Sequence, residues 1–358
     1  ATTAATVTLA TDKLADDTVT PAYAAASFGD KNVGTGKPVS VSGISISGPD
    51  AGNYNLTNAI AGTLANITQR DLHVGAAGVN KIYDGTTAAT VTLSTDKVPS
   101  DSVSASYTIA SFADRNVGTN KAVSVAGLAI ALTDAANYNL TNTSATTTAN
   151  ITSRLIAIKA DDKTKLLASA DPPLTYTVMS GMLAAGDSWA GALTRDSGET
   201  VGSHAIKQGT LTVTDGNSGN NYAIGFTGGT FQILYAGSGT CAGDAGHVVL
   251  QPINIDGTSV FKQGSTVPAK FRVCDANGKS IGDPGVVQSF VATYMAGAST
   301  GVNEAIVSTT PDTAFRWDAS GQQWIFNVST KNLSANRTYI YVITLNDGST
   351  ITFRFGLK

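Results

Sequence analysis

The chain has 358 residues, too many for one ordinary hydrophobic core, so its length predicts several domains. Charged residues make up 14% of the sequence and the net charge is −3, which argues against nucleic acid as a partner because no basic surface is available for phosphates. No apolar run is long enough for a membrane span. Short alternating runs of Val, Ile and Leu instead predict a β-rich protein with Thr, Ser and Asn on its outer faces.

A tandem repeat organises the first part of the chain. Residues 2–70 align without gaps with residues 86–154, and roughly 43 of the 69 pairs are identical by direct comparison. The shared blocks include TTAATVTL, NVGT, NYNLTN and ANIT-x-R. Thr alternates with Val or Leu along TTAATVTL, a period of two that predicts a half-buried strand. Each copy is therefore expected to be a small β-sandwich with immunoglobulin-like packing.

The first copy lacks a segment that the second copy has. The second begins with RDLHVGAAGVNKIYDG (70–85), which should supply its opening strand, and no counterpart stands before Thr2. A sandwich without that strand has an unpaired edge or an open groove. Two explanations are open: Ala1 is a processed, trimmed or renumbered end, or another molecule supplies the strand by donor-strand assembly.

Donor-strand assembly predicts an acceptor edge in the first copy and a donor strand elsewhere. The acceptor edge would be formed by Thr6, Val7, Thr8 and Leu9. The final segment ITFRFGLK alternates correctly to be a donor, with Ile351, Phe353, Phe355 and Leu357 on one face, although its own domain also needs a closing strand. The expected partners are thus other copies of the same protein, in a homopolymer or fibre.

Two further units complete the chain. Residues 155–235 are more diverged but end with NYAIGFTGGTFQIL, which parallels the Asn-Tyr block and closing strand of the repeats. A linker rich in Gly, Ala and Ser follows at 236–246. Residues 247–358 contain a predicted hairpin and two alternating closing strands. The predicted fold class is all-β, with four tandem immunoglobulin-like β-sandwiches in an elongated array, at 1–70, 71–154, 155–235 and 247–358.

Several motifs resemble domains of large bacterial surface proteins, including filamentous-haemagglutinin-type adhesins. The repeat with KIYDGTT (81–87) resembles a YDG repeat, and residues 1–70 resemble the same repeat without KIYDG. The third unit, with ADDKTK, DPPLTYTV, GALTR and GETVGSHAI, resembles an MBG domain, although Leu166 and Leu167 stand where an aromatic residue and a Gly are favoured. The last unit resembles a PxKF domain through its VPAKF and FRWDASGQQWIFNVSTK segments. This resemblance implies a secreted surface protein and transfers no catalytic residues.

Catalysis and metal binding have little support in the sequence. His73, His204 and His247 lie in three different units, and no common catalytic or nucleotide-binding motif occurs. We therefore expect no enzyme and no cofactor. Structural calcium is one option for Asp161-Asp162, for the segment 215–221 and for Asp244, but no loop has the ligand spacing of a strong calcium site. Turn formation is the favoured explanation of these residues.

Three small sets of residues are candidate sites. Cys241 and Cys274 are predicted to form a disulfide, which implies an oxidising, extracellular location, with two buried free thiols as the alternative. An isopeptide bond is considered for Lys81 with Asn137 or Asn139 and Asp84 as the assisting acid, against the favoured view of an exposed Lys and a turn. The aromatic residues of the last unit are either its core, which is favoured, or a platform for sugar rings; they are Trp317, Trp324, Tyr339 and Tyr341.

Two functions compete on this evidence. The leading hypothesis is a structural subunit or stalk of a bacterial extracellular fibre or adhesin, located outside the cell or on its surface, because tandem units build a rod in which each unit contacts its neighbour. Strand complementation at the first copy would join subunits. The alternative is an adhesin that binds host or environmental glycans, or a receptor, through residues 247–358.

Overall fold

The computed structural model describes residues 3–295 and 314–358. It separates into two compact units. One contains Ala1–Arg154 with the short segments Ala184–Gly186 and Asn220–Tyr222, and the other contains the rest of the chain. Strands make up the regular structure of the described residues apart from two short 3-10 turns, η1 (Ala51–Asn53) and η2 (Ala135–Asn137). The predicted all-β fold class is therefore confirmed.

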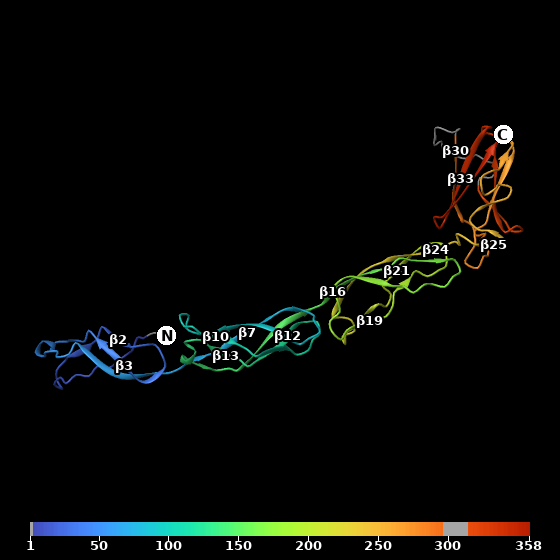
Figure 1. Ribbon diagram of the computed structural model, residues 1–358. Coiled ribbons are helices and arrows are strands. Elements are labelled where there is room, and N and C mark those ends of the chain that lie inside the picture. Colours follow the sequence, from blue (N-terminus) through green and yellow to red (C-terminus); the bar gives the residue numbers. More distant parts are fainter. Residues whose placement is uncertain (1–2, 296–313) are drawn as a thin grey trace. The chain divides into compact units, whose positions relative to one another are not determined.

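The first repeat has five strands in two small sheets. The strands are β1 (Thr20–Ala22), β2 (Ala25–Phe28), β3 (Gly34–Ser42), β4 (Ser45–Ser47) and β5 (Ile60–Ile67). β2, β3 and β5 form one antiparallel sheet in that order, of which Figure 1 labels β2 and β3, and β1 pairs with β4. Its buried core consists of Ala26, Val39 and Val41, with other apolar side chains packed around them while still partly exposed.

The second repeat contains the same strands and several more. They are β6 (Arg70–Leu72), β7 (Val74–Val79), β8 (Lys81–Ile82), β9 (Thr90–Thr95), β10 (Ser104–Ser106), β11 (Ile109–Phe112), β12 (Gly118–Ala126), β13 (Ala129–Ala131), β14 (Tyr138–Leu140) and β15 (Ser144–Thr152). The main sheet has the order β11-β12-β15-β8, and β10–β13, β14–β6 and β7–β9 are two-stranded. Five strands have no counterpart in the first repeat: β6, β7 and β8 come from the segment 70–85, and β9 and β14 pair with β7 and β6.

The same short sequence forms a strand in the second repeat, where β7 is present, and no strand in the first. Residues 6–11 match β9 (Thr90–Thr95) except for Ala10 in place of Ser94, yet residues 6–11 form no strand. β9 pairs along its whole length with β7 in antiparallel register, from Thr90↔Val79 to Thr95↔Val74. Because a strand is defined by its ladder of backbone hydrogen bonds, the same sequence without a partner remains irregular.

The second unit begins with a further set of strands. They are β16 (Arg154–Ala160), β17 (Lys163–Leu166), β18 (Tyr176–Ser180), β19 (Ser188–Ala190), β20 (Thr194–Arg195), β21 (Gly202–Lys207), β22 (Thr212–Thr214), β23 (Tyr222–Thr227) and β24 (Gly229–Leu234). The sheets have the orders β18-β16-β23, β17-β24-β21-β20 and β19-β22. β17 pairs in parallel with the last strand, β24, as β8 pairs with β15 in the second repeat.

The last part of the chain is a sandwich of two four-stranded sheets. Its strands are β25 (Thr240–Cys241), β26 (Asp244–Ala245), β27 (Val249–Leu250), β28 (Val260–Phe261), β29 (Thr266–Phe271), β30 (Val287–Met295), β31 (Arg316–Asp318), β32 (Gln323–Ser329), β33 (Arg337–Leu345) and β34 (Thr350–Leu357). The sheets have the orders β27-β29-β32-β31 and β28-β34-β33-β30, and β25 pairs with β26. Alternate apolar side chains of β29, β32, β33 and β34 form one core between them.

Candidate functional site

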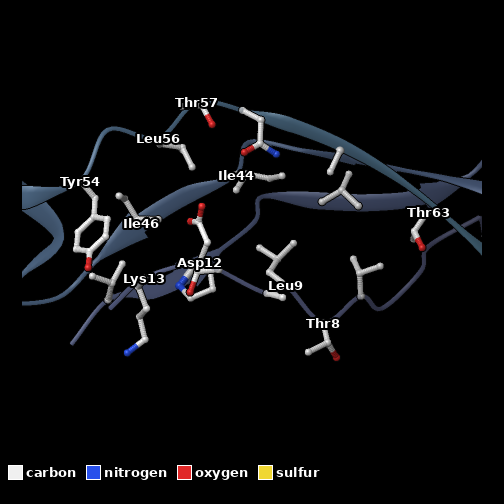
Figure 2. A pocket seen from close by; sticks show the side chains of 18 of the residues that line it. Thr8, Leu9, Asp12, Lys13, Ile44, Ile46, Tyr54, Leu56, Thr57 and Thr63 are labelled. Carbon is white, nitrogen blue, oxygen red and sulfur yellow. The ribbon is translucent and has the colours of Figure 1, made fainter. Parts of the chain in front are cut away.

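A groove of about 640 Å³ opens on the first repeat. Residues 8–13 form one wall and Tyr54 to Thr57 the other, with Ile44 and Ile46 between them (Figure 2). Leu9 in that wall and Ile44 remain partly exposed to the groove although both pack on the small buried core. The surface of the groove therefore combines apolar side chains with a row of backbone groups that belongs to no sheet.

The second repeat shows what fills the equivalent space. There β6 and β7 insert Leu72 and Val74, whose side chains are completely buried. Polar side chains of the repeat hold the inserted backbone: Asn142 accepts a hydrogen bond from the Val74 N–H at 2.9 Å and donates to its carbonyl at 2.9 Å. Asp96 accepts the His73 N–H at 2.9 Å. The segment 70–85 is thus bound through both its side chains and its main chain.

The first repeat retains the side chains that hold this segment. Asp12 corresponds to Asp96, and Asn58 corresponds to Asn142. Both line the open groove. The groove therefore exposes the counterparts of two residues that contact the segment 70–85 in the second repeat.

The predicted assembly residues have different outcomes. Thr6, Val7, Thr8 and Leu9 lie in the unpaired segment, and Val7, Thr8 and Leu9 line the groove. The predicted donor is wrong, because β34 pairs on one side with β33 and on the other with β28. The side chains proposed to enter a neighbour are core residues of their own domain, with exposed fractions of 4% or less for Ile351, Phe353, Phe355 and Leu357.

A joint between the two repeats is built on Asn137. The Val33 N–H donates to Asn137 Oδ1 at 2.9 Å, and Asn137 Nδ2 donates to Asn32 Oδ1 at 3.2 Å. Asn137 is only 8% exposed. A buried amide that satisfies a turn from the preceding repeat fixes that turn, because leaving either polar group unpaired would be costly.

The same joint contains a cation between two carboxylates. Lys31 Nζ lies 2.8 Å from Asp101 Oδ1 and 2.8 Å from Asp134 Oδ1. The pKa values of both carboxyls lie below the usual range, mainly because each accepts a hydrogen bond from Lys31. The Tyr138 hydroxyl, 2.7 Å from Asp101, lowers the pKa of Asp101 further. The carboxylates in turn raise the pKa of Lys31, Asp101 more than Asp134.

The hydrogen bonds that Asn137 makes with Asn32 and Val33 occur a second time in the first unit, 84 positions further along the chain. The Val117 N–H donates to Asn221 Oδ1 at 2.9 Å, and Asn221 Nδ2 donates to Asn116 Oδ1 at 3.1 Å. Asn221, which belongs to this unit, is fully buried. Because these contacts recur with the period of the sequence, they are a property of the repeat and not of one loop.

The first repeat contains the counterparts of the two carboxylates that contact Lys31, at Asp17 and Asp50. The Tyr54 hydroxyl donates to Asp17 at 2.5 Å and the Thr18 N–H donates to Asp50 at 2.8 Å, as Tyr138 and Ser102 do to Asp101 and Asp134. Within the described part of the chain neither Asp17 nor Asp50 has an ion-pair partner. Asn53, the counterpart of Asn137, is exposed.

Comparison with known families accounts for most of these elements. Residues 1–61 and 68–149 match the model of the YDG domain, and residues 156–232 match that of the MBG domain (YGX type). The chain contains two YDG domains and one MBG domain. Such domains are typical of adhesin-like surface proteins, and neither is an enzyme family. No curated protein and no solved structure matches the chain. The PxKF resemblance of residues 247–358 stays a prediction.

The isopeptide candidates of the second YDG domain do not meet. Lys81 Nζ lies 2.8 Å from Asp84 Oδ1 and also donates to the Thr86 and Ala88 carbonyls. Asn137 belongs to the joint described above, and Asn139 Nδ2 donates to Asp71 at 2.8 Å. The structure thus brings Lys81 and Asp84 together but places both amides with other partners, because the Asn-Tyr-Asn block lies beside β6 rather than beside β8.

The aromatic candidates of the last domain are mainly core residues. Trp324, Tyr339 and Tyr341 are 6%, 2% and 1% exposed, because they point inward from alternating positions of β32 and β33. This contradicts a sugar platform made of all four residues. Trp317 is half-buried against Trp324, with ring centres 5.5 Å apart, and the Trp324 indole donates to the Ile281 carbonyl at 2.9 Å.

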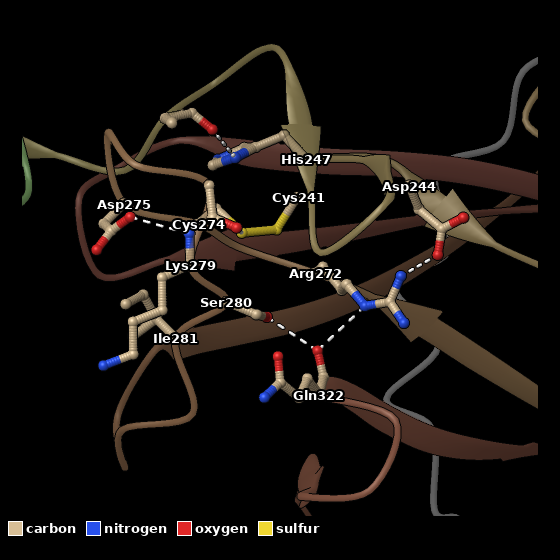
Figure 3. The surroundings of a disulfide bond; sticks show 12 residues. Cys241, Asp244, His247, Arg272, Cys274, Asp275, Lys279, Ser280, Ile281 and Gln322 are labelled. Carbon is tan, nitrogen blue, oxygen red and sulfur yellow. Dashed lines mark hydrogen bonds and ion pairs between the residues drawn. A yellow bond between two sulfur atoms is a disulfide. The ribbon is translucent and has the colours of Figure 1, made fainter.

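The two cysteines are joined by a disulfide between Cys241 and Cys274 (Figure 3). It connects β25, which lies in the predicted linker 236–246, to Cys274, which forms β-bridges with Ala236 and Ser280. The ion pair of Arg272 with Asp244 lies nearby. His247 lies in the same region, where its ring nitrogens contact the Ala236 carbonyl and the Ser349 hydroxyl. Burial is the main cause of a lowered His247 pKa.

The arrangement around His247 is not that of a hydrolase triad. Asp347 accepts the hydrogen bond of the Ser349 hydroxyl itself, whereas a triad places the carboxylate on the far nitrogen of the histidine. His73 and His204 lie in other domains. The structure therefore does not assemble the three histidines into one site.

The acidic residues considered for calcium have roles in local structure. Asp161 accepts the hydroxyls of Thr175 and Thr177, and Asp215 accepts the N–H groups of Asn217 and Gly219 in a turn. Asp244 pairs with Arg272. Among residues 3–295 and 314–358 no three His, Cys, Asp or Glu side chains gather as metal ligands, and no helix is long and apolar enough to cross a membrane.

Sequence reasoning missed the joint although its signal is present in the repeat. Asn-Val occurs at 32–33 and 116–117, and Asn-Tyr occurs at 53–54, 137–138 and 221–222. Each block alone reads as a turn, and Asn221 belongs to the segment 215–221 considered for calcium, so neither pattern by itself indicates a contact between repeats. Their common spacing of 84 residues would have indicated a contact between successive repeats.

Proposed function

We propose that the protein is a non-enzymatic structural stalk of a bacterial extracellular fibre or adhesin, in which the two YDG domains are locked to each other. The observation that carries this proposal is the recurrence of one amide joint, Val33 with Asn137 and Val117 with Asn221, at the period of the repeat. In tandem arrays each unit is stabilised by contact with the next. A buried, directional joint adds resistance to bending, which is what a stalk requires.

Assembly with other chains, including further copies of this one, would use the open groove of the first YDG domain by strand addition. The disulfide between Cys241 and Cys274 supports an extracellular location, since such bonds persist in oxidising surroundings. Binding of glycans or of a receptor by the last domain has less support, because three of its four candidate aromatic residues form the core.

The joint can be tested by measuring distances between the two YDG domains. Spin labels at Ser40→Cys and Ser124→Cys, equivalent exposed positions, report the separation by pulsed electron paramagnetic resonance. The natural cysteines are joined to each other and leave no free thiol. The proposal expects a narrow distance distribution that broadens when Lys31→Ala and Asn137→Ala are combined.

Asn53→Ala provides the matched control, because Asn53 is the exposed counterpart of Asn137. It should leave the distribution narrow. A distribution that is already broad in the unmodified chain, or one that stays narrow without Lys31 and Asn137, would refute the locked stalk.

A further inference from the structure

We propose that the Tyr-Asp-Gly segment at residues 83–85 is an interaction surface of the second YDG domain, and that its partner is a pair of loops from the domain that follows in the chain. The segment belongs to KIYDGTT, the block that carries the resemblance to YDG repeats. The inference rests on the proposed stalk and adds to it a contact that the amide joint of Asn221 does not make.

Two short loops of the MBG domain pack with the YDG domain. Ala184–Gly186 and Asn220–Tyr222 belong to the compact unit that contains Ala1–Arg154, although the residues on either side of each loop belong to the other unit. The loops are also tied to each other, because the Ala184 N–H donates to the Tyr222 hydroxyl oxygen at 2.7 Å. Ala184 and Tyr222 are both 7% exposed. The two loops thus form one buried surface within the unit of the YDG domains.

Tyr83 is the side chain of the motif that meets this pair of loops. Its ring lies edge-on to the ring of Tyr222, with centres 5.4 Å apart and planes at 75°. Aromatic pairs in this arrangement are favourable beyond the area that they bury. Tyr83 is 1% exposed, whereas the preceding residue, Ile82, is 63% exposed. The contact is therefore specific to one ring of the motif.

The other two residues of the motif shape the turn that carries this ring. Gly85 has φ of +82°, a conformation that favours glycine, and a Cβ there would lie 3.0 Å from the Ala184 Cβ. Asp84 Oδ1 accepts the Thr86 N–H at 2.8 Å and lies 2.8 Å from Lys81 Nζ. The glycine thus lets the two backbones approach, while the aspartate holds the turn in shape.

The YDG domain fixes this surface through its last strand. β8 leads into the motif and pairs in parallel with the end of β15, and the Tyr83 N–H then donates to the Thr152 carbonyl at 2.8 Å. Two residues further along, the Arg154 N–H donates to the Asn221 carbonyl at 2.9 Å. The end of β15 therefore contacts both the motif and the loops. A surface that is already ordered loses little conformational entropy on contact, which favours binding.

The size of one side chain decides which kind of domain fits the surface. In each of the two YDG domains the hydroxyl of the corresponding tyrosine accepts a backbone N–H, from Leu14 and from Val98. The MBG domain has Ala184 at this place, the smallest of the three side chains. Because Ala184 lies directly opposite Gly85, a larger residue would hold the surfaces apart. The motif thus fits an MBG domain better than a further YDG domain.

Amide hydrogen exchange of the full chain tests this inference at Ala184 and Val117, whose N–H groups are bonded to the loops. Tyr83→Ala should raise both exchange rates at least tenfold, because the loops lose the ring that covers them and open more often. Tyr83→Phe keeps the ring pair and should restore most of the protection. The matched control is Ile82→Ala, an exposed position in β8, which should leave both rates unchanged.

Ala184→Val places the residue of a YDG domain opposite the motif. It should raise the exchange rate of the Val117 amide at least threefold, whereas Ala184→Gly should not. The amides of β12 report on the YDG domain itself and should keep their protection in every variant.

Unchanged exchange at Ala184 and Val117 in the Tyr83→Ala variant would overturn the inference. An equal increase throughout β12 would also overturn it, by showing that Tyr83 serves only the core of its own domain. Equal rates at Val117 in the Ala184→Val and Ala184→Gly variants would refute the size requirement. None of these outcomes changes the distance distribution expected between Ser40 and Ser124, so failure of this surface is separable from failure of the stalk.

Discussion

The two YDG domains differ in burial although roughly 43 of their 69 aligned residues are identical. In the second domain Phe112, Tyr138 and Ile151 are 3%, 4% and 1% exposed. Their counterparts Phe28, Tyr54 and Ile67 in the first domain are all partly exposed. These residues are therefore core in the domain that contains the segment 70–85, so one segment of three short strands accounts for the difference in packing.

The largest expected effect comes from making the two domains alike. A chain with residues 70–85 placed again in front of Thr2 should bury a second Leu and a second Val in the first domain. Each such side chain contributes about 1.5–3 kcal/mol, which gives roughly 3–6 kcal/mol of added stability. Hydrogen exchange of β3 amides against urea concentration measures it. An unchanged urea midpoint in β3 would show that the groove is not the site of that strand.

The reverse change should make the second domain resemble the first. Leu72→Ala is expected to destabilise it by about 2–5 kcal/mol, because the removed side chain is fully buried. Urea unfolding monitored at β12 measures this loss. Leu64→Ala is the control, since Leu64 is 67% exposed and should change stability by less than about 0.5 kcal/mol. Equal effects of the two substitutions would contradict the assigned role of the first strand.

A smaller difference should separate Asn137, which forms the joint, from its exposed counterpart Asn53. Asn137→Ala leaves the Val33 N–H and the Asn32 amide oxygen without their partner and should cost about 1–3 kcal/mol. Asn53→Ala removes the exposed equivalent and should cost almost nothing. Chemical denaturation of both variants provides the comparison. If the two costs are the same, Asn137 acts within its own domain and not in a joint.

The smallest effect depends on pH. Because the pKa values of Asp101 and Asp134 are lowered in the fold, mainly by Lys31, the unfolded chain binds more protons in acid. Their contribution to stability is complete above about pH 4 and is lost as the pH falls further. Lys31→Met should thus lower the Tm of the second domain at neutral pH. It should lower the Tm less at about pH 2.5, where the two carboxyls are partly protonated.

Lys31→Arg keeps the cation and serves as the control for this pH dependence, with thermal unfolding followed through NMR signals of Val123 and Val125. It should retain most of the difference between neutral and acidic conditions. A Tm loss for Lys31→Met that is independent of pH would mean that Lys31 stabilises the joint by packing instead of by charge.

Much of this comparison could be predicted from sequence. Alternation and turn residues indicated the all-β fold, and the absence of a counterpart to residues 70–85 located the open groove on the first domain. The donor ITFRFGLK was wrong because alternation describes any half-buried strand and cannot show that β34 already has two neighbours. Asn137 was a candidate for an isopeptide bond, but in the structure it belongs to the joint. The sequence did not show this, because its partners Asn32 and Val33 lie over one hundred positions earlier in the chain.

Amide hydrogen exchange of the unmodified chain tests most sharply whether pairing with β7 is what orders β9. It compares residues 6–11 with residues 90–95, which differ at one position. We predict that the amides of β9 are protected by pairing with β7, that residues 6–11 exchange rapidly, and that adding the peptide of residues 70–85 protects them. Equal protection of both segments before peptide is added would show that the first YDG domain closes without the missing strand, and would contradict the account.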